Sequence, residues 1–429
     1  MTKRARLLPS ILFNRFPRRA LAALSVLAML ALPSAHAQTF TVLHTFTGGG
    51  DGANPDSGVT LDSAGNVYGT TFEGGFTHGS CASGCGTVFK LTHANGHTVL
   101  QTIYAFQGLQ DGAAPGASMV FGPDGALYGT TLQGGAGDIG SVFRLTPQPS
   151  LCRSISCSWL DSHYSFPAGY MDGSPSAGAL IFDNFGNMYG TAGFGGAGNC
   201  GLVYEMSQRG GTWTETILYN FDEPTPCEPI GGVIFDASGN LYGTTTRGGP
   251  ADRGTIYQLT PHGVTWSETV LYNFTGQQDG GYPQAGLISD GNGGFYGAAS
   301  VSSPGGGTIF HLTQSGGTWN FSVIYTLPGN SNNTGVLRDL TMDAPRNLYG
   351  ATYTGGAFGR GSVIKLAPSD GGWTYTDLQD FDGGFDGAEP ACKIAIDAIG
   401  RLYGTTFYGA SEGNTCPQEG CGVVWRITP

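Results

Sequence analysis

The sequence predicts an all-β protein, a seven-bladed β-propeller with four antiparallel strands in each blade, and three observations support this prediction. A Tyr-Gly pair recurs seven times, each repeat holds short segments with strand character, and the two ends of the chain carry complementary parts of one repeat. A fixed period of this size is typical of a repeat array, and four antiparallel strands per unit are typical of a propeller blade. The pairs begin, at spacings of 53 to 61 residues, at Tyr68, Tyr128, Tyr189, Tyr242, Tyr296, Tyr349 and Tyr403.

The fourth repeat illustrates the predicted strands in order. The apolar segment "GVIFD" (residues 232–236) is the first strand, and a tight turn leads into the second, "LYGTT" (residues 241–245). After a glycine-rich loop come the third strand, "GTIYQLT" (residues 254–260), and the fourth, "VLYNF" (residues 270–274). We expect the same order in every repeat.

The two chain ends predict how the ring closes. The last repeat stops after its third strand, at Thr428 and Pro429, whereas an unassigned fourth strand, "TFTVLHTF" (residues 39–46), stands near the start. Pairing these two segments would complete the last blade and remove the two unpaired edges of an open array.

The repeated motif itself is best explained by architecture. Leu241 and Tyr242 face opposite sides of their strand and are both apolar, as expected for a blade packed between two others. Gly243 is expected to leave room where sheets approach closely. A residue that serves one catalytic site need not recur seven times.

Residues 1–37 are typical of a secretory signal peptide. Six basic residues precede an apolar run (residues 20–32) that is too short to span a bilayer, and Ala35 and Ala37 flank a cleavage site before Gln38. We therefore expect residues 38–429 to form a single propeller domain that is secreted, periplasmic or extracellular, is not inserted in the membrane and is monomeric.

The composition limits the class of partner. Without residues 1–37, the chain has 13 Lys and Arg against 31 Asp and Glu, a net charge of −18. Such a charge argues against nucleic-acid binding. The chain has 74 glycines but also 11% aromatic residues, which favour a packed core over disorder.

The chain closely resembles the GloVer tandem-repeat family, also called choice-of-anchor repeat proteins. The resemblance is carried by "DSAGNVYGTT" (residues 62–71), "DASGNLYGTT" (residues 236–245) and the "GTVFKLT" type of strand, and it covers nearly all of residues 38–429. It implies an exported bacterial repeat protein, often tethered by a C-terminal anchor, with no established activity. This chain ends inside a predicted strand without an apolar tail, which argues against tethering.

A row of aspartates is expected on one rim of the ring. Five segments between blades contain Asp-Gly followed by Pro. These carboxylates could accept hydroxyl groups of a sugar or coordinate Ca²⁺, or they could serve as turn residues that bond nearby backbone amides. The turn interpretation is favoured. The aspartates are Asp51, Asp111, Asp172, Asp279 and Asp386.

The two longest loops between second and third strands suggest a binding lip. They belong to the first and last repeats, which ring closure makes neighbours. Aromatic surfaces with a few polar groups suit saccharide or peptide recognition, although isolated exposed aromatics are also ordinary. The lip residues are Phe72, Phe76, His78, Tyr408 and Glu412.

Cysteine spacing in an exported protein predicts local disulfides. Three close pairs are Cys81 with Cys85, Cys152 with Cys157, and Cys416 with Cys421, whereas Cys200 and Cys227 share a face and could bridge. Cys392 is left over. A zinc site built from Cys81, Cys85, Cys416 and Cys421 is a weaker alternative.

Catalytic signatures are weak. "GASEG" (residues 409–413) matches a serine-hydrolase motif but lies in a loop without a following helix, and the histidines lack metal-ligand spacing. We therefore expect no cofactor and favour a non-enzymatic propeller that binds a glycan or protein on its loop face. The alternatives are a polysaccharide hydrolase or lyase and a structural cell-envelope component.

Overall fold

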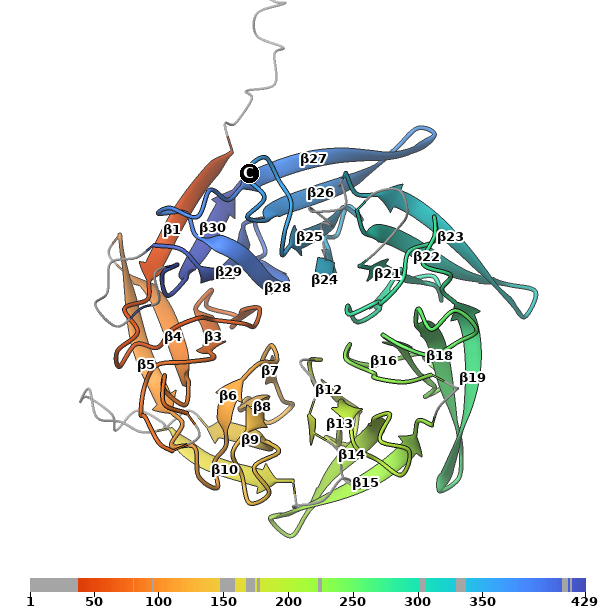
Figure 1. The fold of residues 1–429 in the computed structure, drawn as a ribbon, viewed down its shortest axis with the longest axis horizontal. Helices are drawn as coiled ribbons and strands as arrows, with labels where there is room; N and C mark the ends of the chain where they lie inside the picture. The colour runs from red at the N-terminus through yellow and green to blue at the C-terminus, as the bar shows by residue number, and fades with distance from the viewer. Residues whose placement is uncertain are drawn as a thin grey trace, which may run out of the picture. The chain divides into compact units, whose positions relative to one another are not determined.

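Seven antiparallel β-sheets stand around a common centre in the computed structural model (Figure 1). The structure describes residues 38–79, 81–94, 96–146, 159–166, 174–175, 178–222, 226–300, 306–328, 337–410, 416 and 419–429. The predicted signal peptide lies outside these residues. Across the described ranges, no helix has the length and apolar character needed to cross a membrane.

Each sheet is one blade, and its strands follow one another from the centre outward. The first blade has β2 (Thr60–Leu61), β3 (Val67–Thr71), β4 (Thr87–Ala94) and β5 (His97–Ala105). The second has β6 (Ala113–Pro115) and β7 (Val120–Phe121), both paired with β8 (Leu127–Gln133), then β9 (Ser141–Thr146) and β10 (Leu160–Ser165). The third has β11 (Ser174–Pro175) and β12 (Ile181–Phe182), both paired with β13 (Met188–Phe194), then β14 (Leu202–Arg209) and β15 (Thr212–Asn220).

The remaining blades follow the same order. The fourth has β16 (Ile234–Phe235), β17 (Leu241–Thr245), β18 (Thr255–His262) and β19 (Thr265–Asn273). The fifth has β20 (Ile288–Ser289), β21 (Phe295–Ala299), β22 (Thr308–Ser315) and β23 (Thr318–Thr326). The sixth has β24 (Leu337–Met342), β25 (Leu348–Thr352), β26 (Ser362–Ser369) and β27 (Gly372–Asp380). The seventh has β28 (Ala388–Ile396), β29 (Leu402–Tyr408), β30 (Val423–Thr428) and β1 (Thr39–Thr45).

The seventh blade contains both ends of the propeller. β1 pairs antiparallel with β30, with Phe40 opposite Ile427 and Val42 opposite Trp425. Figure 1 shows β1, in red, beside β30, in blue. The predicted seven-bladed propeller, closed by its N-terminal strand, is therefore confirmed.

The glycine of the Tyr-Gly pair makes room for a ring on the next strand. Gly243 lies opposite Tyr257, and a Cβ atom on Gly243 would come within 2.4 Å of the Tyr257 hydroxyl oxygen. The ring comes from the same blade, not from a neighbouring sheet as the sequence suggested. Five other blades have the same pairing of glycine with an aromatic residue: Gly69 with Phe89, Gly129 with Phe143, Gly190 with Tyr204, Gly297 with Phe310, and Gly404 with Trp425.

The tyrosine of the pair ties its strand to the preceding turn. The Tyr242 hydroxyl donates to Asp236 at 3.0 Å, and Asp236 also accepts the backbone N–H groups of Ser238 and Asn240. In the fifth blade, His311 bonds the turn aspartate instead and its ring stacks on the tyrosine. The same hydroxyl contact joins Tyr68 to Asp62, Tyr128 to Asp124, Tyr189 to Asp183, Tyr349 to Asp343, and Tyr403 to Asp397.

At most contacts between blades, a tryptophan of one blade packs against the Tyr-Gly tyrosine of the preceding blade. The ring of Tyr242 packs on Trp319 of the next blade, with centroids 5.7 Å apart. Tyr68 with Trp159, Tyr128 with Trp213, and Tyr296 with Trp373 repeat this contact. Around the closing blade, Phe40 and Leu100 take the place of tryptophan in the clusters that contain Tyr349 and Tyr403.

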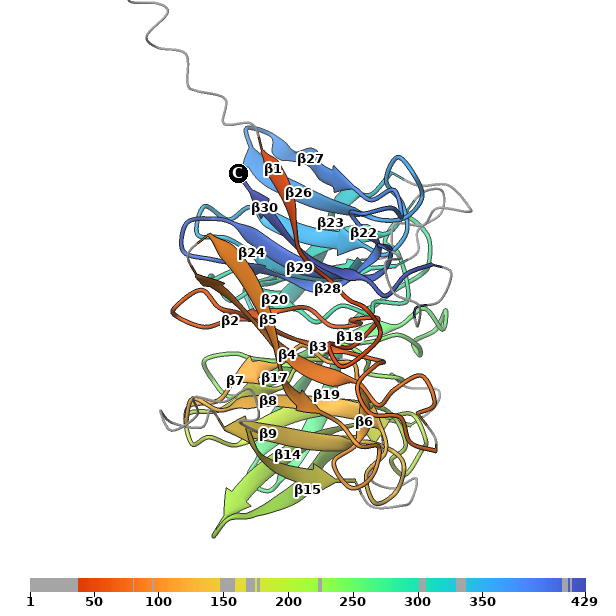
Figure 2. The ribbon, with the colours of Figure 1, turned by 90° about the vertical axis from the view of Figure 1, so that its left-hand side faces the viewer.

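The antiparallel order gives the ring two different faces, seen from the side in Figure 2. One side of the ring contains the turns between first and second strands and the hairpins between third and fourth strands, and we call it the turn face. The other side contains the loops between second and third strands and the crossovers between blades, and we call it the loop face. The turn face contains the repeated Asp–Tyr contacts.

Candidate functional site in the central channel

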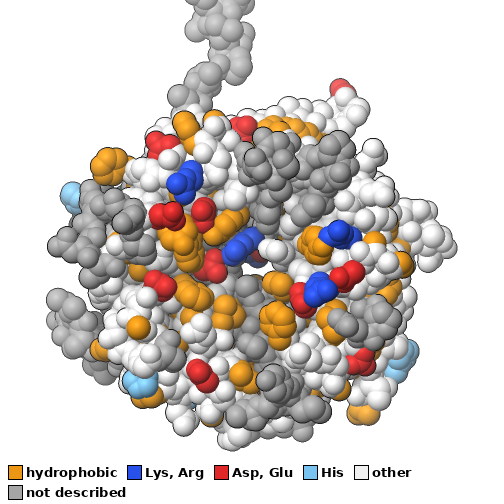
Figure 3. Space-filling view, in the orientation of Figure 1, with side chains coloured by type: hydrophobic (Ala, Val, Ile, Leu, Met, Phe, Trp, Pro, Cys, Tyr) orange, Lys and Arg blue, Asp and Glu red, His pale blue; other side chains and the backbone are white. Residues whose placement is uncertain are grey.

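A cavity of about 470 Å³ lies at the centre of the ring. Its lining comes from the innermost segments of all seven blades, so it lies on the ring axis. The volume falls within the range of small-molecule sites. Figure 3 shows charged side chains of both signs gathered at the middle of the ring. The charged residues that line the cavity are Asp56, Arg338, Asp339 and Lys393.

One position of the inner segments breaks the symmetry of the ring. In every blade, one residue of the innermost strand pairs with the tyrosine of the Tyr-Gly pair on the second strand. The position in question lies two residues before that inner-strand residue. Five blades have a small residue there, whereas the sixth and seventh blades have a charged one. In blade order, the residues are Gly58, Ser118, Ala179, Gly232, Gly286, Asp339 and Lys393.

At two of these positions, neighbouring inner segments leave no room for a side chain. A Cβ atom on Gly58 would lie 2.3 Å from the backbone oxygen of Lys393, and one on Gly232 would lie 2.8 Å from that of Ala179. The exposed Lys393 side chain and the half-buried Asp339 side chain depart from the small residues that the other five blades have at this position. Their presence indicates a local role that symmetry does not explain.

Asp56 and Arg338 form an ion pair on the same wall. Arg338 Nη1 donates to Asp56 Oδ1 at 2.7 Å, and the guanidinium lies 4.7 Å from the centre of the Tyr353 ring. Burial raises the pKa of Asp56, and the nearby Arg338 charge opposes that rise. Burial and a hydrogen bond with Glu389 raise the pKa of Tyr353, so its hydroxyl is protonated at neutral pH.

Asp339 and Lys393 extend this charged wall. Burial raises the pKa of Asp339, and the Lys393 charge only partly offsets this effect. Asp339 Oδ1 accepts the backbone N–H of Leu340 at 2.9 Å. The wall thus presents two carboxyl groups that protonate more readily than usual, beside two cations.

The opposite wall of the cavity is mostly aliphatic, with Gln284 and Ser289 as its polar side chains. It comes from the third, fourth and fifth blades, whereas the charged wall comes from the sixth, seventh and first. A cavity with one polar and one apolar wall can orient a ligand that has both kinds of surface. The aliphatic residues are Ile181, Ile230, Val233, Ile234, Leu287 and Ile288.

The two loops of the predicted lip are neighbours on the loop face. The Asn54 carbonyl accepts the Phe72 N–H at 3.1 Å, and Asn54 Nδ2 donates to the Phe407 carbonyl at 2.9 Å. Phe76 is 57% exposed and His78 is exposed. Ligand binding by these side chains stays a prediction.

The other lip residues are less accessible. Phe72 and Tyr408 are half-buried, and Glu412 lies outside the described residues. Burial and the negative charges of Glu389, Glu419, Glu73 and Asp56 raise the pKa of Tyr408.

The described rim aspartates bond within their own crossovers. Asp111 accepts the N–H of Gln107 at 2.9 Å and the hydroxyl of Tyr104 at 3.0 Å. Asp51, Asp279 and Asp386 likewise bond the residues four and seven positions earlier. The turn interpretation accounts for these contacts, and sugar or Ca²⁺ binding by the rim stays a prediction. Asp172 lies outside the described residues.

Three predicted disulfides are present. Cys81 bonds Cys85, Cys416 bonds Cys421, and Cys200 bonds Cys227. The first two bonds use the four sulfurs of the alternative zinc site. Within the described ranges, no group of three or more His, Cys, Asp or Glu residues is arranged to hold a metal ion. Cys152 and Cys157 lie outside those ranges, and the backbone of Cys392 belongs to β28.

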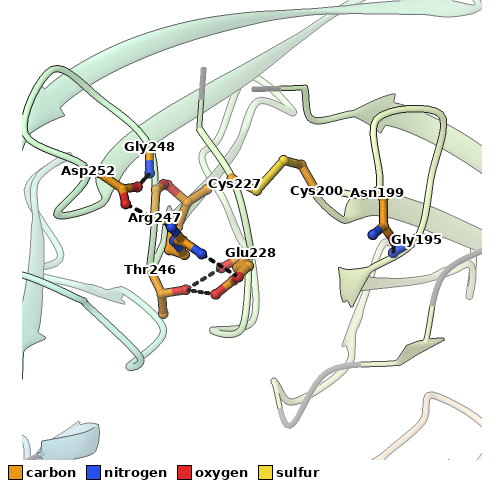
Figure 4. The surroundings of a disulfide bond; sticks show 10 residues. Gly195, Asn199, Cys200, Cys227, Glu228, Thr246, Arg247, Gly248 and Asp252 are labelled. Carbon is orange, nitrogen blue, oxygen red and sulfur yellow. Dashed lines mark hydrogen bonds and ion pairs between the residues drawn. A yellow bond between two sulfur atoms is a disulfide. The ribbon is translucent and has the colours of Figure 1, made fainter. Parts of the chain in front are cut away.

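The disulfide between Cys200 and Cys227 fixes a crossover that lacks the Asp-Gly turn (Figure 4). Cys200 precedes β14 of the third blade, and Cys227 exchanges two backbone hydrogen bonds with Arg247 of the fourth blade. The next residue is Glu228, whose Oε2 accepts a hydrogen bond from Thr246 Oγ1 at 3.0 Å. Its Oε1 lies 3.8 Å from Arg247 Nη1. The bond therefore joins two neighbouring blades on the loop face.

Comparisons with known proteins agree with this architecture. A family model described as the Gloeobacter/Verrucomicrobia repeat matches residues 32–223 and 174–416. The comparison with curated proteins gave no match.

The solved structures that are similar to this chain have low sequence identity to it. A fungal alcohol oxidase in complex with copper is 12% identical, with a TM-score of 0.52, over 91% of this chain and 76% of its own. A hypothetical selenium-binding protein from Sulfolobus tokodaii is 11% identical, with a TM-score of 0.50, over 75% and 79%. A gluconolactonase from Xanthomonas campestris is 15% identical, with a TM-score of 0.42, over 72% and 84%. At these identities, the likenesses concern the fold alone.

Proposed function

Because the chain belongs to the Gloeobacter/Verrucomicrobia repeat family and folds as a propeller, we propose that it is an exported, non-enzymatic protein that binds a glycan in its central channel. Export is supported by the three disulfides, because such bonds persist in oxidising compartments. The signal-peptide character of residues 1–37 points the same way.

The observation that carries the proposal is the charged wall of the channel cavity. Arg338 and Lys393 can donate hydrogen bonds to sugar hydroxyl groups, and Asp56 and Asp339 can accept them. The aliphatic wall opposite can contact the C–H face of a sugar ring. A monosaccharide or the end of an oligosaccharide fits a cavity of about 470 Å³.

The loop face is the proposed side of approach. Asp56 lies two residues after Asn54, whose hydrogen bonds reach the backbones of both lip loops. An oligosaccharide could place its terminal residue in the channel while Phe76 and Tyr408 contact the next ring. This arrangement combines the channel with the predicted lip in one binding surface.

A second candidate function is cleavage of the same glycan, as a hydrolase or a lyase. It is favoured by the raised pKa values of Asp56 and Asp339, because a general acid needs a carboxyl group that keeps its proton to a higher pH than usual. The ion pair between Asp56 and Arg338 favours binding instead, since it engages one of the two carboxylates.

A glycan array with the mature protein, followed by calorimetry and product analysis for each hit, tests both candidates. The proposal expects binding without any product. We expect Asp339→Asn to weaken binding by about 1 to 3 kcal/mol, the range for loss of a hydrogen bond to a charged group. Replacing Phe76 and Tyr408 with Ala should each weaken binding of longer ligands by roughly 1 to 3 kcal/mol.

Two controls separate binding from folding. Asp236→Asn changes a carboxylate of the turn face and should leave glycan affinity unchanged. The melting temperature of Asp339→Asn should not fall below that of the wild type. Product formed by the wild type but not by Asp339→Asn would support the enzymatic candidate and contradict the non-enzymatic one.

A further inference from the structure

A second cavity lies on the turn face, where the seventh blade meets the first. It has a volume of about 170 Å³, room for roughly five water molecules. Its wall includes Leu43 of β1, Gly65 of the first turn and His93 of β4. The lining therefore comes from both sides of the contact that closes the ring.

The side chains of this cavity are basic, in a chain whose net charge is strongly negative. Arg401, Arg426 and His93 line it together with the hydroxyl-bearing Thr92 and Thr98. No Asp or Glu stands in the described lining. Two arginine side chains with hydroxyl donors beside them in a concave site favour an anion.

The other blades show what is unusual about Arg426. It occupies the third-strand position opposite the tyrosine, where three other blades also have a cation. In those blades, the cation lies over the tyrosine ring of its own blade: Lys90 over Tyr68 at 5.3 Å, Arg144 over Tyr128 at 5.9 Å, and Lys365 over Tyr349 at 5.7 Å.

In the seventh blade, a different residue takes this place. Arg401 stands where four other turns have asparagine, donates to Asp397 at 2.6 Å, and lies 5.8 Å from the centre of the Tyr403 ring. Arg426 is left beside the cavity, and its Nε is buried without a hydrogen-bond partner among the described residues.

We propose that this cavity binds one compact oxyanion, such as phosphate or sulfate. Arg426 supplies the central donor. The Thr92 hydroxyl group and His93, whose Nδ1 is hydrogen-bonded to Thr98 Oγ1 at 3.0 Å, supply further contacts. The ligand touches residues of both end blades, so it stabilises the closed ring and ties the hairpin of β4 and β5 to β30. This role is separate from glycan binding in the channel.

The test is titration of the mature wild-type protein with inorganic phosphate and with sulfate by calorimetry at pH 7, against chloride of the same ionic strength. We expect one binding site per chain. Arg426→Gln should raise the dissociation constant about tenfold or more, as expected for loss of a charge-assisted hydrogen bond. Lys365→Gln is the matched control, because it changes the cation at the same position of the sixth blade, and it should bind phosphate as the wild type does.

Thermal melting supplies an independent measurement. Phosphate should raise the melting temperature of the wild type and of Lys365→Gln more than that of Arg426→Gln, because a ligand that binds the folded state stabilises it. Should Arg426→Gln fail to fold, His93→Ala replaces it, since His93 is an exposed hairpin residue. An equal response of all variants, or no phosphate binding beyond the chloride control, would overturn the proposal.

Discussion

The turn face and the central channel differ in how they use the same repeat. On the turn face, six of the seven blades repeat one contact between an aspartate and a tyrosine hydroxyl. In the channel, equivalent positions hold small residues in five blades and charged residues in two adjacent ones. Repetition therefore indicates the demands of the fold, and departure from repetition indicates where a single ligand could bind.

The pKa values of the carboxyl groups are also shifted in opposite directions in the two regions. Although burial acts to raise the pKa of Asp236, hydrogen bonds from Asn240, Ser238 and Tyr242 lower it below its ordinary value. In the channel, burial outweighs the attraction of nearby cations and raises the pKa of Asp339. The turn carboxylate thus stabilises the folded protein when ionised, whereas the channel carboxylate does not.

The largest expected effect comes from removing the strand that closes the ring. Deletion of residues 38–47 removes β1 and the buried ring of Phe46, which leaves β30 as an unpaired edge. We expect aggregation or loss of most of the stability, which is about 5–15 kcal/mol for typical domains. Cooperative melting of the truncated protein at the wild-type temperature would contradict a closed ring.

The next effect distinguishes packing from hydrogen bonding on the turn face. Tyr242→Ala should lower the free energy of unfolding by roughly 3 to 5 kcal/mol, because it removes a large buried ring. Tyr242→Phe keeps the ring and removes the bond to Asp236, so it should cost about 1 kcal/mol. Chemical denaturation measures both values, and similar losses for the two variants would argue against packing as the main role of this tyrosine.

The disulfide between Cys200 and Cys227 should matter somewhat less. Replacing both cysteines with Ala should cost roughly 2 to 4 kcal/mol, since the bond closes a long loop and fixes a crossover without the Asp-Gly turn. Denaturation of the double variant gives the value, and peptide mapping without reduction checks the three bonds. A Cys81→Ala and Cys85→Ala variant is the control, because that bond closes a loop of a few residues and should contribute less.

The smallest effects test the opposite pKa shifts of the two regions. The lowered pKa of Asp236 gives stability that is present above its unfolded pKa, about 3.9, and is lost as the pH falls through the folded pKa. The raised pKa of Asp339 gives stability that is present below the unfolded pKa and is lost as the pH rises through the folded pKa.

At pH 7, Asp236→Asn should therefore lower the melting temperature and Asp339→Asn should raise it, each by roughly 1 to 3 °C. Both differences should shrink in acid, that of Asp339→Asn below its raised pKa and that of Asp236→Asn only below its lowered pKa. Shifts of the same sign at pH 7 would remove the proposed difference between turn and channel carboxylates.

Much of the fold could be predicted because the same pattern of strands and turns recurs in each of the seven repeats. The predicted second strand, residues 241–245, coincides with β17, and the pairing of the chain ends is confirmed. The first strand was predicted too long, since β16 has only two residues. Gly231 and Gly232 instead pack against the backbones of neighbouring blades. The third and fourth strands were predicted too short, because β18 and β19 continue past the apolar segments into a long polar hairpin.

The charged wall could not be recognised as readily as the repeated aspartates and the long loops, because it rests on a departure from the repeat at a single position in each of two blades. Its signal was present in the alignment of the seven repeats, where Asp339 and Lys393 replace small residues. The pairing of Arg338 with Asp56 could not be predicted, since these residues are far apart in the sequence and meet only when the ring closes.

Making the channel symmetric tests the central claim most directly. The double variant Asp339→Ala with Lys393→Ala gives the sixth and seventh blades the small residue that the third blade has at this position. Calorimetry should be run on this variant and the wild type with the tightest glycan from the array. We expect at least about a hundredfold loss of affinity, from two lost charged hydrogen-bonding groups, with cooperative melting at or above the wild-type temperature. Unchanged affinity in the folded variant would show that the glycan does not bind at the asymmetric wall of the channel.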